Sequence, residues 1–299
     1  MYERYFHLTE RPFSLTPDPG FLFLSASHQQ SLEHLMYGLE TGEGFIVITG
    51  DIGVGKTTIC RALLQRVSGA FTTALVLNPM LTEKELVRGI LHDFGMGLAN
   101  GTKKDCLDAL NRFLLAEADC GRRPVLIVDE AQNLSPSLLE QVRLLSNLET
   151  EKRKLLQIVL IGQKELKEKL SLPSLRQLNQ RVTVRAEILP LTRKETSRYI
   201  HHRLGVAGGA GRTFLLAGAE RAIFNHSKGV PRRINMLCDR AFLSSYLRGG
   251  TEIERKDVRR AVESLSDDQG MARRLLRWVS WVTHTLALLA AATMNRWIA

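Results

Sequence analysis

Cysteine is scarce in this 299-residue sequence, and its four copies, Cys60, Cys106, Cys120 and Cys238, show no C-x-x-C spacing. No cluster of histidines accompanies them, so a disulfide scaffold and a structural zinc site are both disfavoured. We therefore expect buried free thiols in a protein of a reducing compartment. The N-terminal residues lack the long apolar run of a secretory leader, so we expect no signal peptide.

Acidic residues are outnumbered: Lys plus Arg total 41 and Asp plus Glu total 31, which gives a net charge of +10. With 44% hydrophobic and 24% charged residues, the composition is close to that of globular proteins and excludes collagen-like, coiled-coil and disordered classes. At about 100–200 residues per domain, the length predicts two domains. The basic balance suits a polyanionic partner, whether nucleic acid, acidic lipid or phosphate, and does not choose among them.

Five short runs of apolar, mostly β-branched residues predict the strands of a sheet. Continuous runs of this kind are typical of parallel strands that are buried on both faces. The last run alternates with polar residues and is expected at an edge. Helical patterns near 26–40, 56–67, 82–94, 103–118 and 135–148 flank the runs, and the last of these has Ser135 as a candidate cap and Pro136 at its first position. The alternation predicts a three-layer α/β domain with a parallel five-stranded sheet. The runs are Phe45–Thr49, Ala74–Leu77, Val125–Val128, Gln157–Ile161 and Val182–Ile188.

After Pro190 the strand-like runs stop. Thr192 and Glu195 have the spacing of a capping box, in which each side chain satisfies an amide of the other residue. Helical patterns follow near 193–204, 216–227, 232–247 and 255–265, which predicts a small all-helical domain. The expected organisation is an N-terminal linker segment at 1–43, the α/β domain at 44–190, a helical lid domain at 191–265, a linker at 266–274 and an apolar helix at 275–298.

A glycine-rich loop directly follows the first predicted strand and fits the pattern G-x-x-x-x-G-K-[ST]. Glycines let the backbone curl so that successive amides point at phosphate oxygens, and the start of the following helix adds positive potential. Lys56 is expected to reach the β- and γ-phosphates, and Thr57 to hold Mg²⁺. The candidate nucleotide-binding residues are Gly50, Asp51, Ile52, Gly53, Val54, Gly55, Lys56, Thr57 and Thr58.

Two carboxylates, Asp129 and Glu130, follow the apolar strand at Val125–Val128. Ligands of open α/β sheets bind at the carboxyl ends of the strands, which is where these side chains are expected. Asp129 suits a Mg²⁺ ion, bound directly or through water, and Glu130 suits the role of general base for an attacking water. One further predicted strand, Ala74–Leu77, lies in sequence between the two motifs, an order that fits nucleotide-hydrolysing P-loop proteins.

At these motifs the sequence resembles the AAA+ ATPases of the ExeA/GspA type. That family belongs to the general secretion pathway, with relatives in pilus biogenesis, exopolysaccharide export and transposition (the TniB-like proteins). The resemblance covers about residues 1–265. The matching stretches are Pro12-Phe13, Pro17-Asp18-Pro19, Tyr37-Gly38, Gly44-Phe45, the phosphate loop with Thr58 and Arg61, Val128-Asp129-Glu130-Ala131-Gln132, Ile161-Gly162-Gln163, Leu175-Arg176-Gln177-Leu178, Gln180-Arg181, Pro190-Leu191, Tyr199-Ile200, Arg203-Leu204, Gly229-Val230-Pro231-Arg232 and Ile234-Asn235.

The resemblance implies an ATP-driven oligomer that uses ATP and Mg²⁺ and has three further site residues. Gln163 looks like a sensor that orients the water or contacts the γ-phosphate. Arg232 looks like a second sensor, which reports the γ-phosphate at the start of a lid helix. Arg181, with Arg176 as the rival candidate, is placed where related ATPases present an arginine finger to the neighbouring subunit. One departure is Lys164, where the family often has proline.

The segment from Trp278 to Met294 contains no Asp, Glu, Lys or Arg. Its 17 residues would form a helix about 26 Å long, slightly short of the ~30 Å hydrocarbon core. Residues 275–298 would span a bilayer if Arg277 and Arg296 reach opposite interfaces. Arginines before the segment then predict that the ATPase lies on the cytoplasmic side. A helix lying in the interface, or one packing on the protein's own core, remains an alternative.

Taken together, the sequence predicts an ATP-hydrolysing AAA+ protein that drives assembly or remodelling of a bacterial envelope secretion or export apparatus. It would act as a homo-oligomer with envelope components, at the cytoplasmic face of the inner membrane or, alternatively, in the cytoplasm. The alternative function is an ATP-gated DNA-binding protein of the transposition or initiator type, which the basic stretches Lys152-Arg153-Lys154 and Arg259-Arg260 would serve. The apolar C-terminal segment favours the first function. A nucleotide-regulated scaffold without turnover is disfavoured by Glu130.

Overall fold

The structure is a computed structural model that describes residues 1–266 apart from 17, 68, 70, 78–80, 98–100, 151–153 and 213. The expected apolar helix at 275–298, and the expected linker beyond residue 266, lie outside the described residues. Within the described part of the chain, no helix combines the length and the apolar character that crossing a bilayer requires.

A parallel five-stranded sheet with the order β2-β3-β4-β1-β5 forms the centre of the α/β part, as predicted. β4 lies between β1 and β3, so it separates the strand before the glycine-rich loop from the strand before the two carboxylates. β5 is an edge strand, as its alternating pattern predicted. β2 begins at Phe71 rather than Ala74, because the polar Thr72 and Thr73 also pair with β3. The strands are β1 (Phe45–Gly50), β2 (Phe71–Val76), β3 (Arg123–Val128), β4 (Gln157–Gly162) and β5 (Val182–Ile188).

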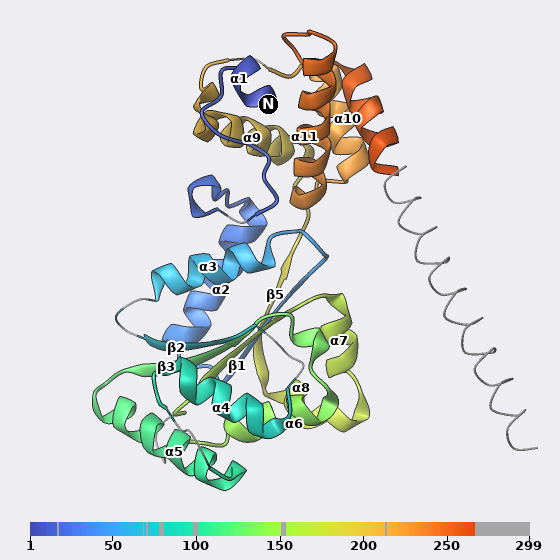
Figure 1. The fold of residues 1–299 in the computed structure, drawn as a ribbon. Helices are drawn as coiled ribbons and strands as arrows, with labels where there is room; N and C mark the ends of the chain where they lie inside the picture. The colour runs from blue at the N-terminus through green and yellow to red at the C-terminus, as the bar shows by residue number, and fades with distance from the viewer. Residues whose placement is uncertain are drawn as a thin grey trace, which may run out of the picture. The chain divides into compact units, whose positions relative to one another are not determined.

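Helices cover both faces of this sheet, which makes the domain three-layered (Figure 1). Successive strand residues point to opposite faces. In β1, Ile46 and Ile48 pack with α2 and α3, whereas Phe45 and Val47 pack on the side of α4, α5 and α6. Both faces of the central strands are therefore buried, which explains why their sequences are continuous apolar runs.

Most helices lie where the sequence patterns place them, and the two predicted caps are present. Ser135 accepts a hydrogen bond from the Leu138 amide, and Thr192 and Glu195 form the reciprocal capping box. The sequence patterns do not indicate α7 and α8, since helices of 7 and 6 residues are too short to show a periodic pattern. The helices are α1 (Tyr2–Tyr5), α2 (Ala26–Glu40), α3 (Lys56–Arg66), α4 (Glu83–Asp93), α5 (Lys103–Asp119), α6 (Pro136–Leu145), α7 (Lys164–Leu170), α8 (Arg176–Arg181), α9 (Arg193–Leu204), α10 (Ala217–Ser227), α11 (Pro231–Leu247) and an unlabelled helix over 255–266; short 3-10 turns η1 (Pro19–Phe21), η2 (Ala131–Asn133) and η3 (Pro173–Leu175) and the π-turn η4 (Gly205–Gly209) connect them.

The chain forms two compact units. One comprises Pro17–Glu195 with Val230–Arg232, and the other comprises Met1–Thr16, Thr196–Gly229 and the described residues after Arg232. The expectation of a linker at 1–43 does not match this division, because α2 packs on the sheet and the first 16 residues belong to the helical unit.

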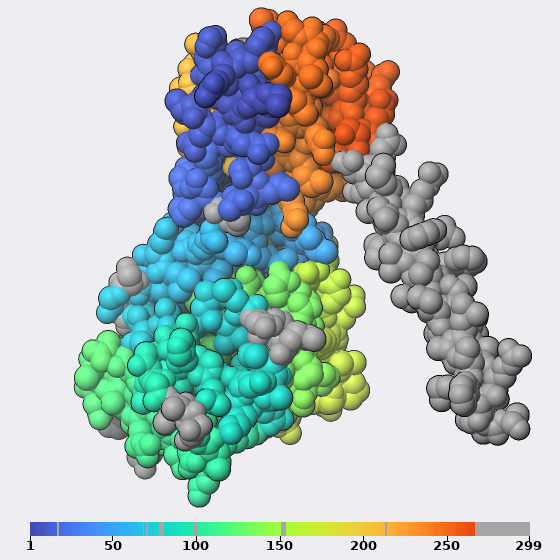
Figure 2. Space-filling model, in the orientation of Figure 1, coloured from blue at the N-terminus to red at the C-terminus, as the bar shows by residue number. Residues whose placement is uncertain are grey.

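Aromatic packing explains why the N-terminal residues join the helical unit. The rings of Tyr2, Phe6 and Phe13 lie with their centroids 5.6, 5.0 and 5.5 Å from that of Phe242 on α11. Figure 2 shows these first residues (blue) beside α11 (orange). Several aromatic side chains packed on one ring bury a large apolar area. Because these residues are far apart in the sequence, the sequence pattern does not predict the contact.

The thiols differ in exposure. Cys60, Cys106 and Cys238 are free and buried, as expected. Cys120 is free but exposed, so the expectation of burial is wrong there. It is the C-cap residue of α5, in the turn that leads to β3.

Candidate functional site

The glycine-rich loop connects the end of β1, at Gly50, to the start of α3, at Lys56. Two of its residues have backbone conformations that favour glycine: φ is 79° at Gly53 and 110° at Gly55. These conformations curl the loop at the carboxyl edge of the sheet, directly before a helix N-terminus. The local geometry is thus that of an anion-binding cradle.

Lys56 is buried beside this loop and bonds to its backbone. The Nζ atom donates to the carbonyl oxygens of Gly50 and Asp51 at 3.0 and 3.1 Å. Burial lowers the pKa of Lys56, while the carboxylates of Glu130 and Asp129 act in the opposite direction. An ammonium group held in this way, at the mouth of a ring of amides, is suited to bind phosphate oxygens.

Asp129 and Thr57 bring two oxygen ligands together. Thr57 Oγ1 donates to Asp129 Oδ2 at 3.2 Å, and Asp129 Oδ1 accepts from the Glu130 amide at 2.8 Å. Burial raises the pKa of Asp129, and nearby Glu130 adds to this effect, so a cation here would relieve an unfavourable buried charge. A hydroxyl and a carboxylate oxygen at this spacing fit the ligand preference of Mg²⁺, which also takes water and phosphate oxygens.

Glu130 has an unusual backbone conformation and a restrained side chain. Its φ of 51° lies in the left-handed region, which non-glycine residues seldom adopt. Its Oε2 atom accepts hydrogen bonds from Gln132 Nε2 at 2.6 Å and from Gln163 Nε2 at 3.2 Å. The carboxylate is therefore aimed by two amide donors, and Gln163, at the end of β4, is brought to it as the strand order requires.

Gln132 lies in one of the stretches that resemble the family, but the sequence assigns it no role. Besides donating to Glu130, its Oε1 atom accepts from the Gln163 amide at 3.0 Å. Lys169 on α7 donates to the backbone carbonyls of Gln132 and Leu134 at 2.5 and 2.8 Å, which fixes the turn after β3. Gln132 thus links the carboxylate after β3 to the end of β4. No pattern in the sequence signals such a contact.

Lys164, which departs from the family pattern, bonds to the phosphate loop. Its Nζ atom lies 2.9 Å from Asp51 Oδ2, and both side chains are about half exposed. An exposed ion pair of this kind contributes little to the free energy of unfolding. Lys164, where the family often has proline, therefore adds a weak ion pair between the loop and α7.

Arg232 lies against the loop through its backbone. Its amide donates to the Gly53 carbonyl at 3.2 Å. A Cβ atom on Gly53 would approach the Arg232 Cβ to 2.7 Å, so only glycine allows this close approach. The residue predicted to be a second sensor is thus adjacent to the loop.

Arg176 and Arg181 do not join this site within one chain. They begin and end α8, which precedes β5. Val182 pairs with Phe45, at the start of β1, whereas the phosphate loop follows the other end of that strand, about 17 Å away at ~3.3 Å per residue. Arg181 Nη1 donates to Ser146 Oγ at 2.7 Å, and Arg176 is exposed.

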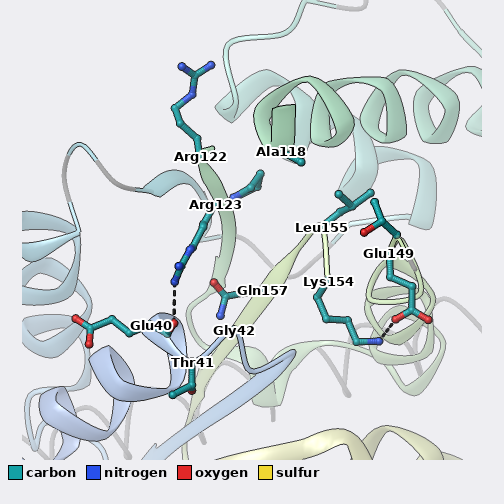
Figure 3. Close-up of a pocket in the computed structure, with 12 residues that line it drawn as sticks. Glu40, Thr41, Gly42, Ala118, Arg122, Arg123, Glu149, Lys154, Leu155 and Gln157 are labelled. Carbon is teal, nitrogen blue, oxygen red and sulfur yellow. Dashed lines mark hydrogen bonds and ion pairs between the residues drawn. The ribbon is translucent and has the colours of Figure 1, made fainter. Parts of the chain in front are cut away.

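A cavity of about 680 Å³ also lies at this opposite edge of the sheet (Figure 3). Its cationic side chains are already bonded: Arg123 to the Glu40 carbonyl at 2.8 Å, Lys154 to Glu149, and Arg122 to Glu117. Because the glycine-rich loop and both carboxylates are at the other edge, this cavity is not the nucleotide site.

Comparison with known proteins agrees with these features. Residues 39–170 match the AAA domain family. General secretion pathway protein A of Aeromonas hydrophila is 41% identical over 297 residues, which is 98% of this chain and 52% of that protein. The chain therefore spans about half the length of this relative.

Solved structures share the fold at low sequence identity. The Aeropyrum pernix ORC2 protein has a TM-score of 0.62 at 18% identity, covering 85% of this chain and 71% of that one. Drosophila ORC bound to DNA has a TM-score of 0.64 at 18% identity, covering 84% and 63%. A Thermotoga maritima RuvB mutant has a TM-score of 0.56 at 17% identity, covering 84% and 74%. Residues 39–170 thus match the AAA domain family, and the chain is similar along 98% of its length to general secretion pathway protein A.

Proposed function

We propose that this chain is a Mg²⁺-dependent ATPase that drives assembly or remodelling of a bacterial envelope secretion or export apparatus. The observation that carries the proposal is the convergence of Lys56, the Thr57–Asp129 pair and Glu130 at one edge of the sheet. The 41% identical relative from the general secretion pathway supports the cellular role. The proposed place of action is the cytoplasmic face of the inner membrane.

Each residue has a distinct proposed role. The loop amides and Lys56 bind the phosphates, and Thr57 with Asp129 would hold Mg²⁺, which when bound neutralises charge on the β- and γ-phosphates. Glu130 takes a proton from the attacking water. Since both amide donors reach Oε2, we assign Oε1 to that proton. Gln163 and Arg232 act as the sensors of the γ-phosphate.

The arginines of α8 are proposed to act on a neighbouring subunit, because they lie at the edge of the sheet opposite their own phosphate loop. Arg176, being exposed, needs no rearrangement for this role, whereas Arg181 would have to leave Ser146. The expected assembly is a homo-oligomer in which each nucleotide site is completed by the next copy.

Phosphate release, measured on the full chain with Mg²⁺ and ATP over a wide range of protein concentration, tests this function. We expect the specific rate to rise steeply with concentration and to vanish in EDTA. Replacement of the finger by alanine (Arg176→Ala or Arg181→Ala) should cost ~10³-fold or more in rate. Ser146→Ala is the control for Arg181, since it removes only the acceptor. A measurable rate that is flat with concentration would remove the shared-site proposal, and no hydrolysis at any concentration would remove the ATPase itself.

Gln132→Leu should separate catalysis from binding. Leucine fills similar space but offers neither the donor to Glu130 nor the acceptor for the Gln163 amide. We expect kcat to fall ~10-fold or more while the nucleotide dissociation constant stays within about twofold. The reason is that the hydrogen bond to the Glu130 carboxylate and the one from the Gln163 amide are both lost. Steady-state kinetics and nucleotide titration measure the two quantities. The exposed Gln30→Leu on α2 is the control, and an unchanged kcat in Gln132→Leu would contradict the positioning role.

A DNA-binding function is the second candidate. Its support is the basic balance of the chain and the fold shared with Drosophila ORC bound to DNA. That likeness is at 18% identity and concerns the fold alone, whereas the secretion relative is 41% identical. A DNA titration across salt concentration discriminates, because phosphate contacts give an affinity that falls steeply with salt.

A further inference from the structure

The outward-facing carbonyls of the phosphate loop have dedicated partners. The Gly53 carbonyl accepts from the Arg232 amide, and the Val54 carbonyl lies 2.9 Å from His28 Nε2. Across a trans peptide, the carbonyl and the following amide point in opposite directions. A Val54 carbonyl held on the outside therefore turns the Gly55 amide to the inner side of the loop, where phosphate oxygens are expected.

His28 is a buried residue with a defined protonation pattern. It is 3% exposed, and its Nδ1 atom lies 2.6 Å from the hydroxyl of Ser25, the N-cap residue of α2. A carbonyl oxygen can only accept, so Nε2 carries the proton and Nδ1 accepts from Ser25. Burial lowers the pKa of His28, which favours this neutral ring.

The imidazole ring also fits the shape of the loop. A Cβ atom on Gly55 would come within 2.6 Å of His28 Nε2. Together with its φ of 110°, this contact requires glycine at position 55. The ring and the loop thus fit together without space for a side chain between them.

The helix turn that carries His28 is itself fixed to two other segments. The Ala26 amide donates to Glu195 at 3.0 Å, and Ser27 Oγ accepts from the Leu189 amide at 2.9 Å. Neighbouring residues of the first turn of α2 therefore have separate anchors. A support of this kind is what a preorganised binding loop needs, because misplacement of a donor by about 1 Å weakens its bond to a ligand.

We propose that His28, oriented by Ser25, is a positioning residue for nucleotide binding that holds the Val54 carbonyl outward and the Gly55 amide toward the phosphates. This rests on the proposed nucleotide site at the same loop. His28 does not touch the nucleotide in this role, and it acts through the loop backbone alone.

Two substitutions at position 28 of the full chain test the role. His28→Leu keeps apolar bulk but removes the donor, and His28→Gln keeps a donor near the position of Nε2. We expect His28→Leu to weaken binding of a fluorescent ADP analogue ~10-fold or more, the loss associated with one buried hydrogen bond. His28→Gln should recover most of that affinity. Ser25→Ala, which frees Nδ1, should lie between them.

Controls distinguish this role from packing and from failure of the nucleotide site itself. His34→Leu makes the same change at an exposed position of α2 and should bind as the wild type does. Thermal unfolding of each variant confirms that titrations are made on folded protein, with Ser25→Ala as the readout if His28→Leu does not fold. The inference would be overturned if His28→Leu bound the nucleotide analogue as tightly as the wild type, or if His28→Gln bound it as weakly as His28→Leu. Where Ser25→Ala is the readout, an affinity equal to that of the wild type would overturn it as well. If the wild type does not bind nucleotide, the proposed function is refuted as well. If the wild type binds nucleotide and Lys56→Ala does not, the His28 variants test the positioning role alone.

Discussion

Glu130→Gln is expected to bind ATP as tightly as the wild type and to hydrolyse it ~10²–10⁴-fold more slowly, the range associated with loss of a general base. A glutamine oxygen can still accept from the amides of Gln132 and Gln163, so the turn after β3 should keep its conformation. Only the ability to take a proton from water is lost. Binding and chemistry should therefore separate cleanly in this variant.

Single-turnover hydrolysis and nucleotide titration, performed on the same preparation, measure the two effects. Glu165→Gln is the matched control, since Glu165 is exposed on α7 and neutralising it changes the charge near Lys56 without removing the proposed base. Turnover at the wild-type rate in Glu130→Gln would refute the base assignment. We expect the variant to stay in the ATP state, so under the proposed function it is the form that should retain envelope components.

The phosphate loop and the two carboxylates could be predicted because their signals are local. Glycine, lysine and threonine stand at fixed spacing after an apolar run, and Asp129 and Glu130 follow another. The carboxyl ends of parallel strands meet at one edge, so a strand assignment is enough to bring the two motifs together. The same reasoning correctly gave the sheet, its edge strand and the helix caps.

The supporting contacts could not be predicted because they join residues that are far apart and have no special spacing. His28 reaches Val54 through the packing of α2, and Gln132 reaches the end of β4 only because β4 lies beside β3. The location of Arg181 depends on the register between β5 and β1. The aromatic residues before Thr16 looked like a linker because their partner, Phe242, is more than two hundred residues away.

Lys56→Ala is the other large effect: nucleotide affinity should fall ~10–150-fold, because hydrogen bonds from a charged group are worth about 1.5–3 kcal/mol each. The wild-type ammonium is already held at the loop by the carbonyls of Gly50 and Asp51. The Lys56 side chain therefore loses little conformational entropy when it binds phosphate. Removing a buried charge also removes its desolvation cost, so the variant should remain folded. Isothermal titration with ADP and with ATP measures the loss.

The pH dependence of binding provides a second test of the same lysine. Burial lowers the pKa of Lys56, so in the nucleotide-free protein its proton is lost at a lower pH than from an exposed lysine. Phosphate favours the charged form and raises the pKa in the complex. Wild-type affinity should therefore decrease as the pH rises from the lowered pKa toward that of the complex, and Lys56→Ala should lack this decrease.

Lys164→Ala, which removes a nearby lysine that is paired with Asp51 and half exposed, is the control and should keep both the affinity and its pH dependence. An affinity in Lys56→Ala equal to that of the wild type would mean that the loop binds phosphate through its amides alone.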